Sequence, residues 1–298
     1  MLRPYQQAAH DAAINWIKRS IEPAIIEAET GCHKKGYKIL MADGSTKNVE
    51  CISIGDHVMG LNGVPRKVID IHNGHDHMFE INPINGEPYI VNGGHILNLY
   101  KTRVRKGDSI SYTNISVYDF LKKDKRFKHL HKLHRSKIDF VSKDISIDPW
   151  TLGFLIGDGC MTGTPGVTIC DLDYYLIDEI KLKLKCFDIA PKRIQFHKTG
   201  CKQYSLKGIG TSRSVRNKLT VELEKLGINV SAEFKFVPDI YKFNSCDVRN
   251  NILSGLLDSD GHYDKKTFDW ISKSKVLADD VVFLSRSLGL RAHVSECI

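Results

Sequence analysis

The chain has 298 residues, 42% of them apolar and 26% charged, which is the composition of a globular protein with room for two domains. No apolar run approaches the roughly 20 residues that a membrane-spanning helix needs, and the first residues do not read as a secretory signal, so we expect no membrane partner. Eight cysteines without a C-x-x-C pair favour neither a zinc ribbon nor a disulfide framework, and we expect a cytoplasmic protein.

Positive charge is concentrated in two blocks of the chain. Residues 101–143 hold 13 Lys and Arg against 4 Asp and Glu, and residues 179–218 hold 11 against 2. The formal net charge is only +8, so the rest of the chain is acidic on balance. Two basic blocks fit a polyanionic partner such as a DNA backbone, and a solvated basic surface is the alternative.

Residues 1–31 differ in pattern from the rest of the chain. Apolar spacing predicts an amphipathic helix over Ala8–Arg19, and Ala24–Ile26 is a short apolar strand. A strand followed by A-x-T-G resembles the opening of a phosphate-binding loop, and LRPYQQAA resembles the adenine-reading segment of superfamily 2 DNA helicases, with Gln6 as its reader. The lysine that such a loop needs never follows, which argues against an ATP-binding helicase fragment with an unrelated β insertion.

From Cys32 the pattern becomes all-β. Turn signals at Asp43-Gly44, Gly55-Asp56 and Asn62-Gly63 separate short runs. The predicted strands are Lys38–Met41, Val49–Ile52, His57–Met59 and Arg66–Ile71. This stretch resembles the N-terminal block of inteins, the self-splicing proteins of the Hint fold. The resemblance implies an all-β Hint horseshoe, here incomplete, and makes residues 1–31 part of a host helicase sequence, the extein.

The resemblance gives Cys32 the first step of splicing. Its thiol, the strongest side-chain nucleophile near neutral pH, would attack the Gly31 carbonyl and convert the peptide bond to a thioester. The leaving nitrogen needs a proton, and inteins take it from a histidine in a T-x-x-H pattern that His95 matches. Asn92 stands where threonine is usual, and we expect it to donate a hydrogen bond to the scissile carbonyl. A small buried cysteine and a satisfied core histidine are the alternatives.

Two further groups of histidines carry no predicted function. They are His72, His75 and His77 in a hairpin loop, and His129, His131 and His134 in a Lys-rich run. Zinc sites need Cys or His partners in fixed geometry, and none is evident. A solvated surface is therefore the preferred interpretation of both groups.

Two similar stretches follow a basic connector of residues 101–148, TLGFLIGDG ending in Gly159 and LSGLLDSDG ending in Gly261. Small residues where a buried helix would carry bulk let two helices approach backbone to backbone. If both helices end at one level, Asp158 and Asp260 come together, where the helix dipoles and each other's charge disfavour them. Mg²⁺ would relieve both effects, and such a site suits phosphodiester hydrolysis. The alternative is two ordinary apolar helices with Asp-Gly turns.

Both stretches resemble the signature of the LAGLIDADG (dodecapeptide, DOD-type) homing endonucleases. Two copies, with acids 102 positions apart, imply an α+β pseudo-dimer of αββαββα repeats, the second incomplete. The resemblance makes Asp158 and Asp260 the metal-binding catalytic acids with Mg²⁺ as cofactor, and double-stranded DNA at the intein-free host site the substrate. Lys235 opens KFVP, similar to the family's K-x-I-P segment, where a lysine assists catalysis. A surface lysine before a strand is the alternative, and Gly261 is expected to end its helix in the left-handed conformation.

The remaining elements follow from periodicity and turn signals. The predicted helices are Val117–Lys122, Asp173–Cys186, Val215–Leu226 and Lys275–Leu288. The predicted strands are Val167–Cys170, Arg193–His197, Gln203–Leu206, Thr267–Ile271 and Leu290–Glu296.

The predicted domains are the host fragment 1–31, the splicing block with its connector 32–145, and the endonuclease 146–298. Inteins close with a terminal His-Asn pair before a Cys, Ser or Thr, and the His-Asn pair of this sequence, His72-Asn73, is followed by Gly74. We therefore expect a C-terminally truncated chain, or one half of a split intein with a C-terminal fragment acting in trans. The predicted function is self-splicing with Mg²⁺-dependent DNA cleavage, and the alternative is a decayed element that only binds DNA.

Overall fold

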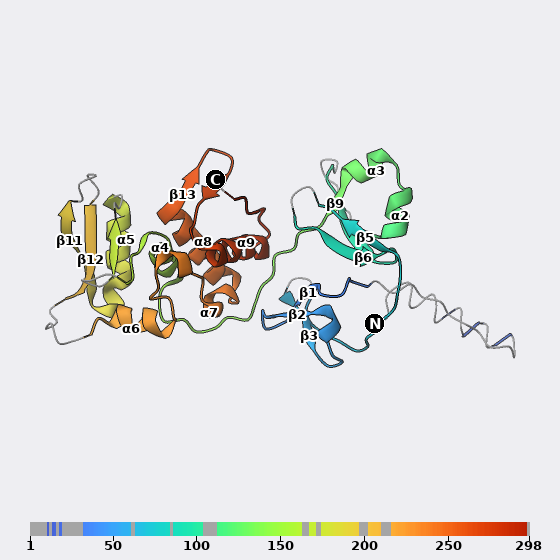
Figure 1. Ribbon diagram of the computed structural model, residues 1–298, viewed down its shortest axis with the longest axis horizontal. Coiled ribbons are helices and arrows are strands. Elements are labelled where there is room, and N and C mark those ends of the chain that lie inside the picture. The colour runs from blue at the N-terminus through green and yellow to red at the C-terminus, as the bar shows by residue number, and fades with distance from the viewer. Residues whose placement is uncertain are drawn as a thin grey trace. The chain divides into compact units, whose positions relative to one another are not determined.

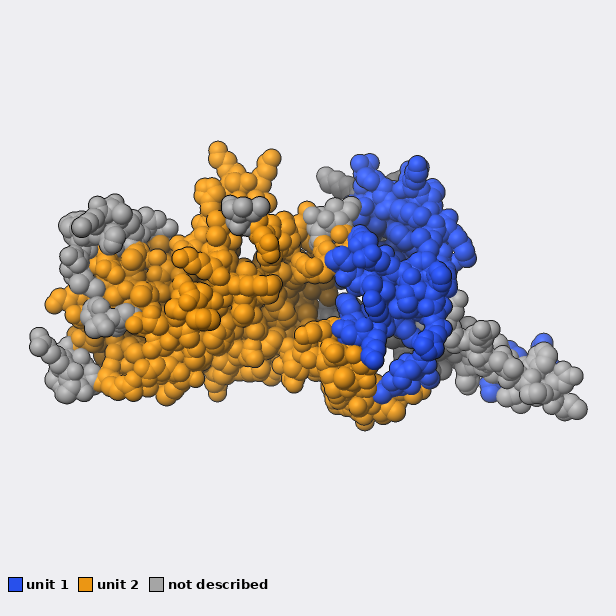
Figure 2. Space-filling model, in the orientation of Figure 1, with its two compact units in different colours: residues 1–37, 71–82, 88–134 blue, residues 38–70, 83–87, 135–298 orange. Residues whose placement is uncertain are grey.

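The computed structural model describes residues 11, 14, 15, 18, 19, 32–60, 63–83, 86–103, 112–162, 167–170, 174–196, 202–209 and 216–296. The chain forms two compact units (Figure 2): unit 1 comprises residues 1–37, 71–82 and 88–134, and unit 2 comprises residues 38–70, 83–87 and 135–298. Most of the predicted helix Ala8–Arg19, the strand Ala24–Ile26, Gln6 and Gly31 lie outside the described residues. The predicted functional boundaries after residues 31 and 145 stay predictions.

Unit 1 is built on antiparallel strands. β5 (Met78–Ile81) pairs with β6 (Tyr89–Asn92), and β7 (Ile96–Lys101) lies between β8 (Tyr112–Ser116) and β9 (His131–Leu133). Alternation along β7 buries Leu97 and Leu99, and these side chains form the core with Val91, Ile115 and Val117.

Two short helices complete unit 1. α2 (Val117–Lys122) begins at Ser116, whose hydroxyl accepts a hydrogen bond from the Asp119 amide. α3 (Lys125–Leu130) begins at Asp124, which caps it in the same way. The predicted helix Val117–Lys122 is confirmed, and α3 was not predicted.

The N-terminal part of unit 2 consists of two hairpins. β1 (Lys38–Leu40) pairs with β2 (Thr46–Asn48), and β3 (His57–Met59) pairs with β4 (Pro65–Lys67). The prediction of a strand over Val49–Ile52 is wrong, because Val49–Cys51 is a turn of 3₁₀ helix directly after β2. The predicted strand His57–Met59 is confirmed, and the strand predicted over Arg66–Ile71 begins one residue earlier and ends at Lys67.

Helices, a three-stranded sheet and a short hairpin form the rest of unit 2 in the ranges that the structure describes (Figure 1). The sheet has the order β10 (Thr168–Cys170), β12 (Lys202–Gly208), β11 (Ile189–Phe196), and all its pairs are antiparallel. The helices are α4 (Pro149–Asp158), α5 (Tyr174–Leu184), α6 (Lys218–Lys225), α7 (Asp239–Lys242), α8 (Cys246–Asp260) and α9 (Lys275–Ser287), with 3₁₀ turns at Lys185–Phe187 and Ala232–Phe234. A short hairpin, β13 (Gly261–Tyr263) and β14 (Phe268–Trp270), follows α8.

The apolar core of unit 2 surrounds α4 and α8. Leu152 and Leu155 of α4 and Ile252 and Leu256 of α8 are fully buried, and Leu284 of α9 joins them. Nearly every residue of α4 is apolar or small, which explains why the helix is buried on all sides rather than along one stripe.

The predicted strand Val167–Cys170 is confirmed as β10, and Cys160 adds an isolated bridge to Thr168. Two other predictions for this region need correction. The strand expected over Leu290–Glu296 has no regular structure, since no neighbouring strand lies beside it among the described residues. Gly261 follows α8 in the extended conformation, with φ −81°, not in the left-handed one.

Residues 138–147 are fastened to α7 and α8 by reciprocal hydrogen bonds. The Tyr241 hydroxyl donates to the Ile147 carbonyl and accepts from its amide, and Asn244 exchanges two bonds with Lys143 in the same manner. Fully buried Arg249 donates to the Ile138 carbonyl. This part of the predicted basic connector is therefore an integral piece of unit 2.

Among the helices that the structure describes, none combines the length and the apolar character needed to cross a membrane.

Candidate functional site

The two signature stretches form helices α4 and α8, which pack against each other backbone to backbone (Figure 1). A methyl group added at Gly153 would overlap the Ile252 carbonyl oxygen and approach the Leu256 nitrogen to 3.1 Å. One added at Gly255 would overlap the Trp150 carbonyl oxygen and lie 2.8 Å from the Phe154 nitrogen. The atoms in the way belong to the main chain, so side-chain rotation cannot make room. The prediction of closely approaching helices is confirmed.

The two helices end side by side. A methyl group at Gly157 of α4 would overlap the Ser259 hydroxyl and come within 3.2 Å of Asp260 Oδ2. Asp158 is the next residue after Gly157, and its Oδ2 accepts a hydrogen bond of 3.1 Å from the Cys170 amide at the end of β10. Both acids are thus brought to one place, one at the end of each helix.

Lys235 lies in the same place and is 8% exposed. Its ammonium group donates to the Gly157 and Gly159 carbonyl oxygens, each at 2.9 Å, and so satisfies carbonyls that the end of α4 leaves without helical partners. Burial lowers the pKa of Lys235, while the charges of Asp260 and Asp158 act in the opposite direction. The structure therefore contradicts the alternative of a surface lysine.

Asp260 keeps part of its carboxylate at the surface, yet the surrounding helix ends displace enough water to raise its pKa. The positive charge of Lys235 partly opposes this rise. A bound divalent cation would favour the ionised carboxylate in the same direction as Lys235, and more strongly.

The donor set at the helix ends fits Mg²⁺. Within the described ranges no group of three or more His, Cys, Asp and Glu side chains converges, so Asp158 and Asp260 are a pair without a third such ligand. Mg²⁺ is commonly held by one or two carboxylates while water and substrate phosphates complete its shell. Two carboxylates at adjacent helix ends fit that pattern, and a closed structural zinc site would not.

The second centre lies in unit 1, where residues 32–34 continue the β5–β6 pair as a third antiparallel segment. The Lys34 amide donates to the Ile90 carbonyl, and His33 bridges Val91. At the end of this segment the Asn92 amide donates to the Cys32 carbonyl at 3.0 Å. The Cys32 amide donates in turn to the Asn92 side-chain oxygen Oδ1 at 2.9 Å.

The Asn92 side chain accepts a hydrogen bond from the Cys32 amide. The bond that it is expected to donate to the Gly31 carbonyl involves a residue outside the described ranges and stays a prediction. The Asn92 Nδ2 group donates to Asp76 Oδ2 at 2.9 Å. Asp76 was missed in the sequence because it lies among the loop histidines, with nothing in the pattern to mark it.

A turn that begins at Asn92 leads the chain to His95. The His95 amide donates to the Asn92 carbonyl at 3.2 Å across two glycines. A side chain at the first of them, Gly93, would overlap the Tyr118 ring, which explains why glycine stands there. Burial lowers the pKa of His95, so its ring is mainly neutral near pH 7.

A pocket of about 390 Å³ opens beside Cys32. Its lining includes Asp76, Asn92 and the exposed loop residues His72 and His75. A small thiol or water could therefore reach this side of the centre. In the described part of the chain these histidines belong to no group of three or more His, Cys, Asp and Glu side chains that could hold a metal ion.

His33 is an ionisable neighbour that sequence reasoning did not single out. Its ring stacks on Tyr37 with centroids 4.5 Å apart and meets His95 edge to face at 4.8 Å. Burial, together with the charge of His95, lowers the pKa of His33 to about 4. The folded state thus holds His33 neutral at pH values where the unfolded chain would bind a proton.

Unit 1 should lose stability as the pH falls from about 6.5 to 4, because only the unfolded chain then protonates His33 readily. We expect a loss on the order of 2 kcal/mol after discounting for partial solvent screening. Amide hydrogen exchange in β6 and β7, followed against pH, measures it. In His33→Phe, which keeps the stacking on Tyr37, the slope should flatten, and an unchanged slope would refute the assignment.

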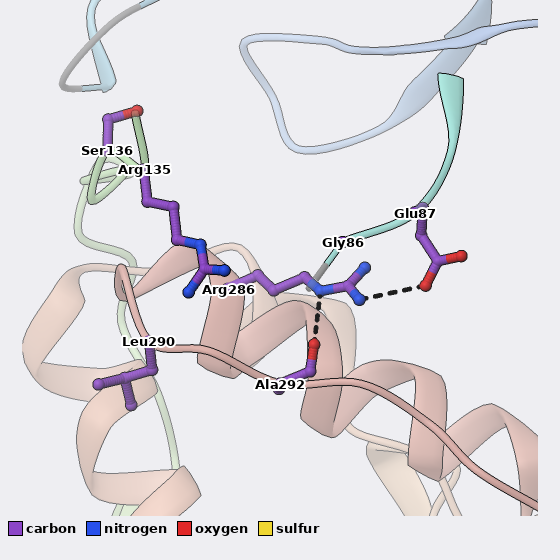
Figure 3. A pocket seen from close by; sticks show the side chains of 7 residues that line it. All are labelled: Gly86, Glu87, Arg135, Ser136, Arg286, Leu290 and Ala292. Carbon is purple, nitrogen blue, oxygen red and sulfur yellow. Dashed lines mark hydrogen bonds and ion pairs between the residues drawn. The ribbon is translucent and has the colours of Figure 1, made fainter. Parts of the chain in front are cut away.

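A further pocket, of about 220 Å³, shares no residue with either centre. Figure 3 shows Arg286 pointing from α9 toward Glu87, to which it is bound at 3.1 Å. The same guanidinium donates to the Ala292 carbonyl. The charge of Arg286 is balanced by Glu87, so we interpret the residues that line this pocket as a structural contact.

Two protein families match parts of the chain. The family described as Hom_end-associated Hint matches residues 32–141, and the family described as Homing endonuclease matches residues 236–297. The first match contains Cys32, Asn92 and His95, and the second contains Asp260. Together they support an intein that carries a homing endonuclease.

Two curated proteins are similar to parts of the chain. It is 33% identical over 103 residues to the catalytic subunit of the V-type proton ATPase of Candida tropicalis, covering 30% of this chain and 10% of that protein. It is 25% identical over 186 residues to the Homothallic switching endonuclease of Saccharomyces cerevisiae, covering 56% of this chain and 31% of that protein. The chain therefore spans a tenth and less than a third of the two relatives' lengths.

Proposed function

We propose that this chain is the N-terminal portion of an intein-containing helicase precursor, with residues 1–31 as host sequence. Self-splicing begins at Cys32, and a LAGLIDADG-type (DOD-type) endonuclease formed around α4 and α8 cleaves double-stranded DNA at the intein-free host site with Mg²⁺. Support for the splicing step is the hydrogen bond from the Cys32 amide to Asn92. Support for the nuclease is that α4 and α8 end side by side, with Lys235 buried against the end of α4 and within the electrostatic influence of both acids.

In the splicing step the Cys32 thiol passes its proton to the neutral ring of His95, and the sulfur attacks the Gly31 carbonyl carbon. A C–S bond forms, the C–N bond breaks, and the Cys32 nitrogen leaves as an amine after gaining one proton. Protonated His95 supplies that proton. Because burial lowers the pKa of His95, the protonated ring is a strong acid when it forms.

In the nuclease, Asp158 and Asp260 would hold Mg²⁺, which when bound supplies electrostatic stabilisation of the charge that develops on the phosphate. The Cys170 amide fixes the direction of the Asp158 carboxylate. Lys235 fixes the main chain on both sides of Asp158 through the Gly157 and Gly159 carbonyls. Its positive charge also offsets the repulsion between the two acids.

The splicing assignment is tested by thiol-induced cleavage of the full chain. Incubation with dithiothreitol should release the 31 residues that precede Cys32, and Cys32→Ala should reduce this release to background hydrolysis because no thioester can form. Mass spectrometry of the released peptide measures it. Exposed Cys51 offers a matched control, since Cys51→Ala should cleave as the unaltered chain does. Release that persists in Cys32→Ala would exclude Cys32 as the nucleophile.

A further inference from the structure

We propose that Asp76 is a positioning residue for the acyl shift, because its carboxylate fixes the Asn92 amide in the orientation that holds the scissile nitrogen of Cys32. The inference rests on the proposed splicing function and adds to it a residue of the loop between β4 and β5. Asp76, Asn92 and Cys32 form a continuous chain of two hydrogen bonds, both 2.9 Å long.

Asp76 decides which way the Asn92 amide faces. A carboxylate can only accept hydrogen bonds, so it attracts Nδ2 and directs Oδ1 toward Cys32. The Cys32 amide can only donate, and it therefore requires Oδ1. Asn92 is 5% exposed, so the loss of one partner leaves part of a largely buried amide group unsatisfied.

The orientation matters because the bond to the scissile nitrogen strengthens during the reaction. As the C–N bond breaks and the nitrogen gains a proton, its N–H groups become more polar and carry positive charge. An acceptor already aimed at that nitrogen stabilises this state more than the starting amide, which is the condition for accelerating the step. The negative charge of Asp76 polarises the Asn92 amide and makes Oδ1 a better acceptor.

The main chain alone does not give this arrangement. The bond from the Asn92 amide to the Cys32 carbonyl holds the far side of Cys32 and would remain without Asp76. The side-chain bond, by contrast, acts on the nitrogen that leaves. Loss of Asp76 should therefore slow the chemical step while strand pairing beside β6 persists.

The first experiment measures thiol-induced release of residues 1–31 from the full chain in Asp76→Asn, which keeps the shape of the side chain. We expect the first-order rate of release to fall about 10- to 100-fold, because the variant loses a charge-assisted hydrogen bond. Asp76→Glu should recover part of the rate. Glu80→Gln, at an exposed position of β5, is the matched control and should cleave at the original rate.

A second measurement separates positioning from a structural role. In chain labelled with ¹⁵N-cysteine, the Cys32 amide proton, assigned by its absence in Cys32→Ala, should move upfield in Asp76→Asn as its hydrogen bond weakens. The other cysteine amides should keep their positions. In an Asn92→Ala background, Asp76→Asn should change neither this resonance nor the rate, because its effect passes through Asn92.

The outcomes distinguish the two levels of the proposal. Absence of release from the unaltered chain, or release that persists in Cys32→Ala, overturns the splicing function itself. Release at the original rate from Asp76→Asn, with the Cys32 amide resonance unmoved, overturns the role of Asp76 alone. Shifts of all cysteine resonances together would show a general structural effect and also reject positioning.

Discussion

Gly255→Ala should destabilise unit 2 by about 3 kcal/mol or more, because the added methyl has no space. It would overlap the Trp150 carbonyl oxygen and press on the Phe154 nitrogen, both main-chain atoms of α4. Relief requires the two helices to separate, which would expose Leu256 and Leu152, both fully buried at this contact. Alanine normally favours a helix over glycine by nearly 1 kcal/mol, so the sign of the effect is itself diagnostic.

Urea denaturation followed by tryptophan fluorescence measures the change, since α4 and β14 each contain a tryptophan. Ser254→Ala is the matched control on the neighbouring position of α8, where the hydroxyl only bonds back to the Asn250 carbonyl. We expect that control to remain within about 0.5 kcal/mol of the original chain. A Gly255→Ala variant as stable as the control would mean that α4 and α8 are not in main-chain contact.

Asp260→Asn should reduce Mg²⁺-dependent DNA cleavage by about a thousandfold while leaving DNA binding and folding intact. The neutral amide cannot balance the charge of a divalent cation as a carboxylate does. Folding should not suffer, because burial raises the pKa of Asp260 and so makes its ionised form a small cost to the folded state above that pKa. Stability near pH 7 should therefore stay level or rise slightly.

Cleavage is measured on a DNA duplex in which the codons for residues 1–31 are followed directly by the sequence that lies beyond the insertion in an uninterrupted homologue. Binding to the same duplex is measured by gel shift. Asp258→Asn is the matched control in the same helix, since Asp258 accepts from the Trp150 indole, a role that an asparagine oxygen can keep. This control should cleave within a few-fold of the original rate. Cleavage by Asp260→Asn at the original rate would remove Asp260 from the catalytic site.

The sequence predicted the helix pair well because its signal is local and steric. Glycine at buried helical positions has few other uses, and Gly153 and Gly255 do lie at the main-chain contact. Lys235 was placed only by resemblance, since the carbonyls that it binds are 76 and 78 positions away in sequence. Its burial could not be read from a lysine next to two aromatic residues.

The misses also have physical causes. The run Val49–Ile52 has apolar residues at both ends, but all residues of β1 are already paired with β2. The chain therefore finds no further strand to pair with there and turns into a 3₁₀ helix. Gly261 is glycine because a side chain would overlap the Leu257 carbonyl oxygen, a close contact that sequence cannot distinguish from a left-handed turn. Asp76 was missed because its proposed role depends on a hydrogen bond to Asn92, which is 16 positions away in the sequence.

The glycine contacts between α4 and α8 also bear on how such a protein can change over generations. Main-chain contacts at Gly153 and Gly255 set the distance between Asp158 and Asp260. Substitutions at exposed positions far from these contacts therefore leave that distance unchanged. Surface residues of β11 and β12, where Lys192 and Lys207 lie, can then be exchanged without disturbing the helix ends. The chemistry of the helix ends can therefore stay constant while exposed residues of the sheet change.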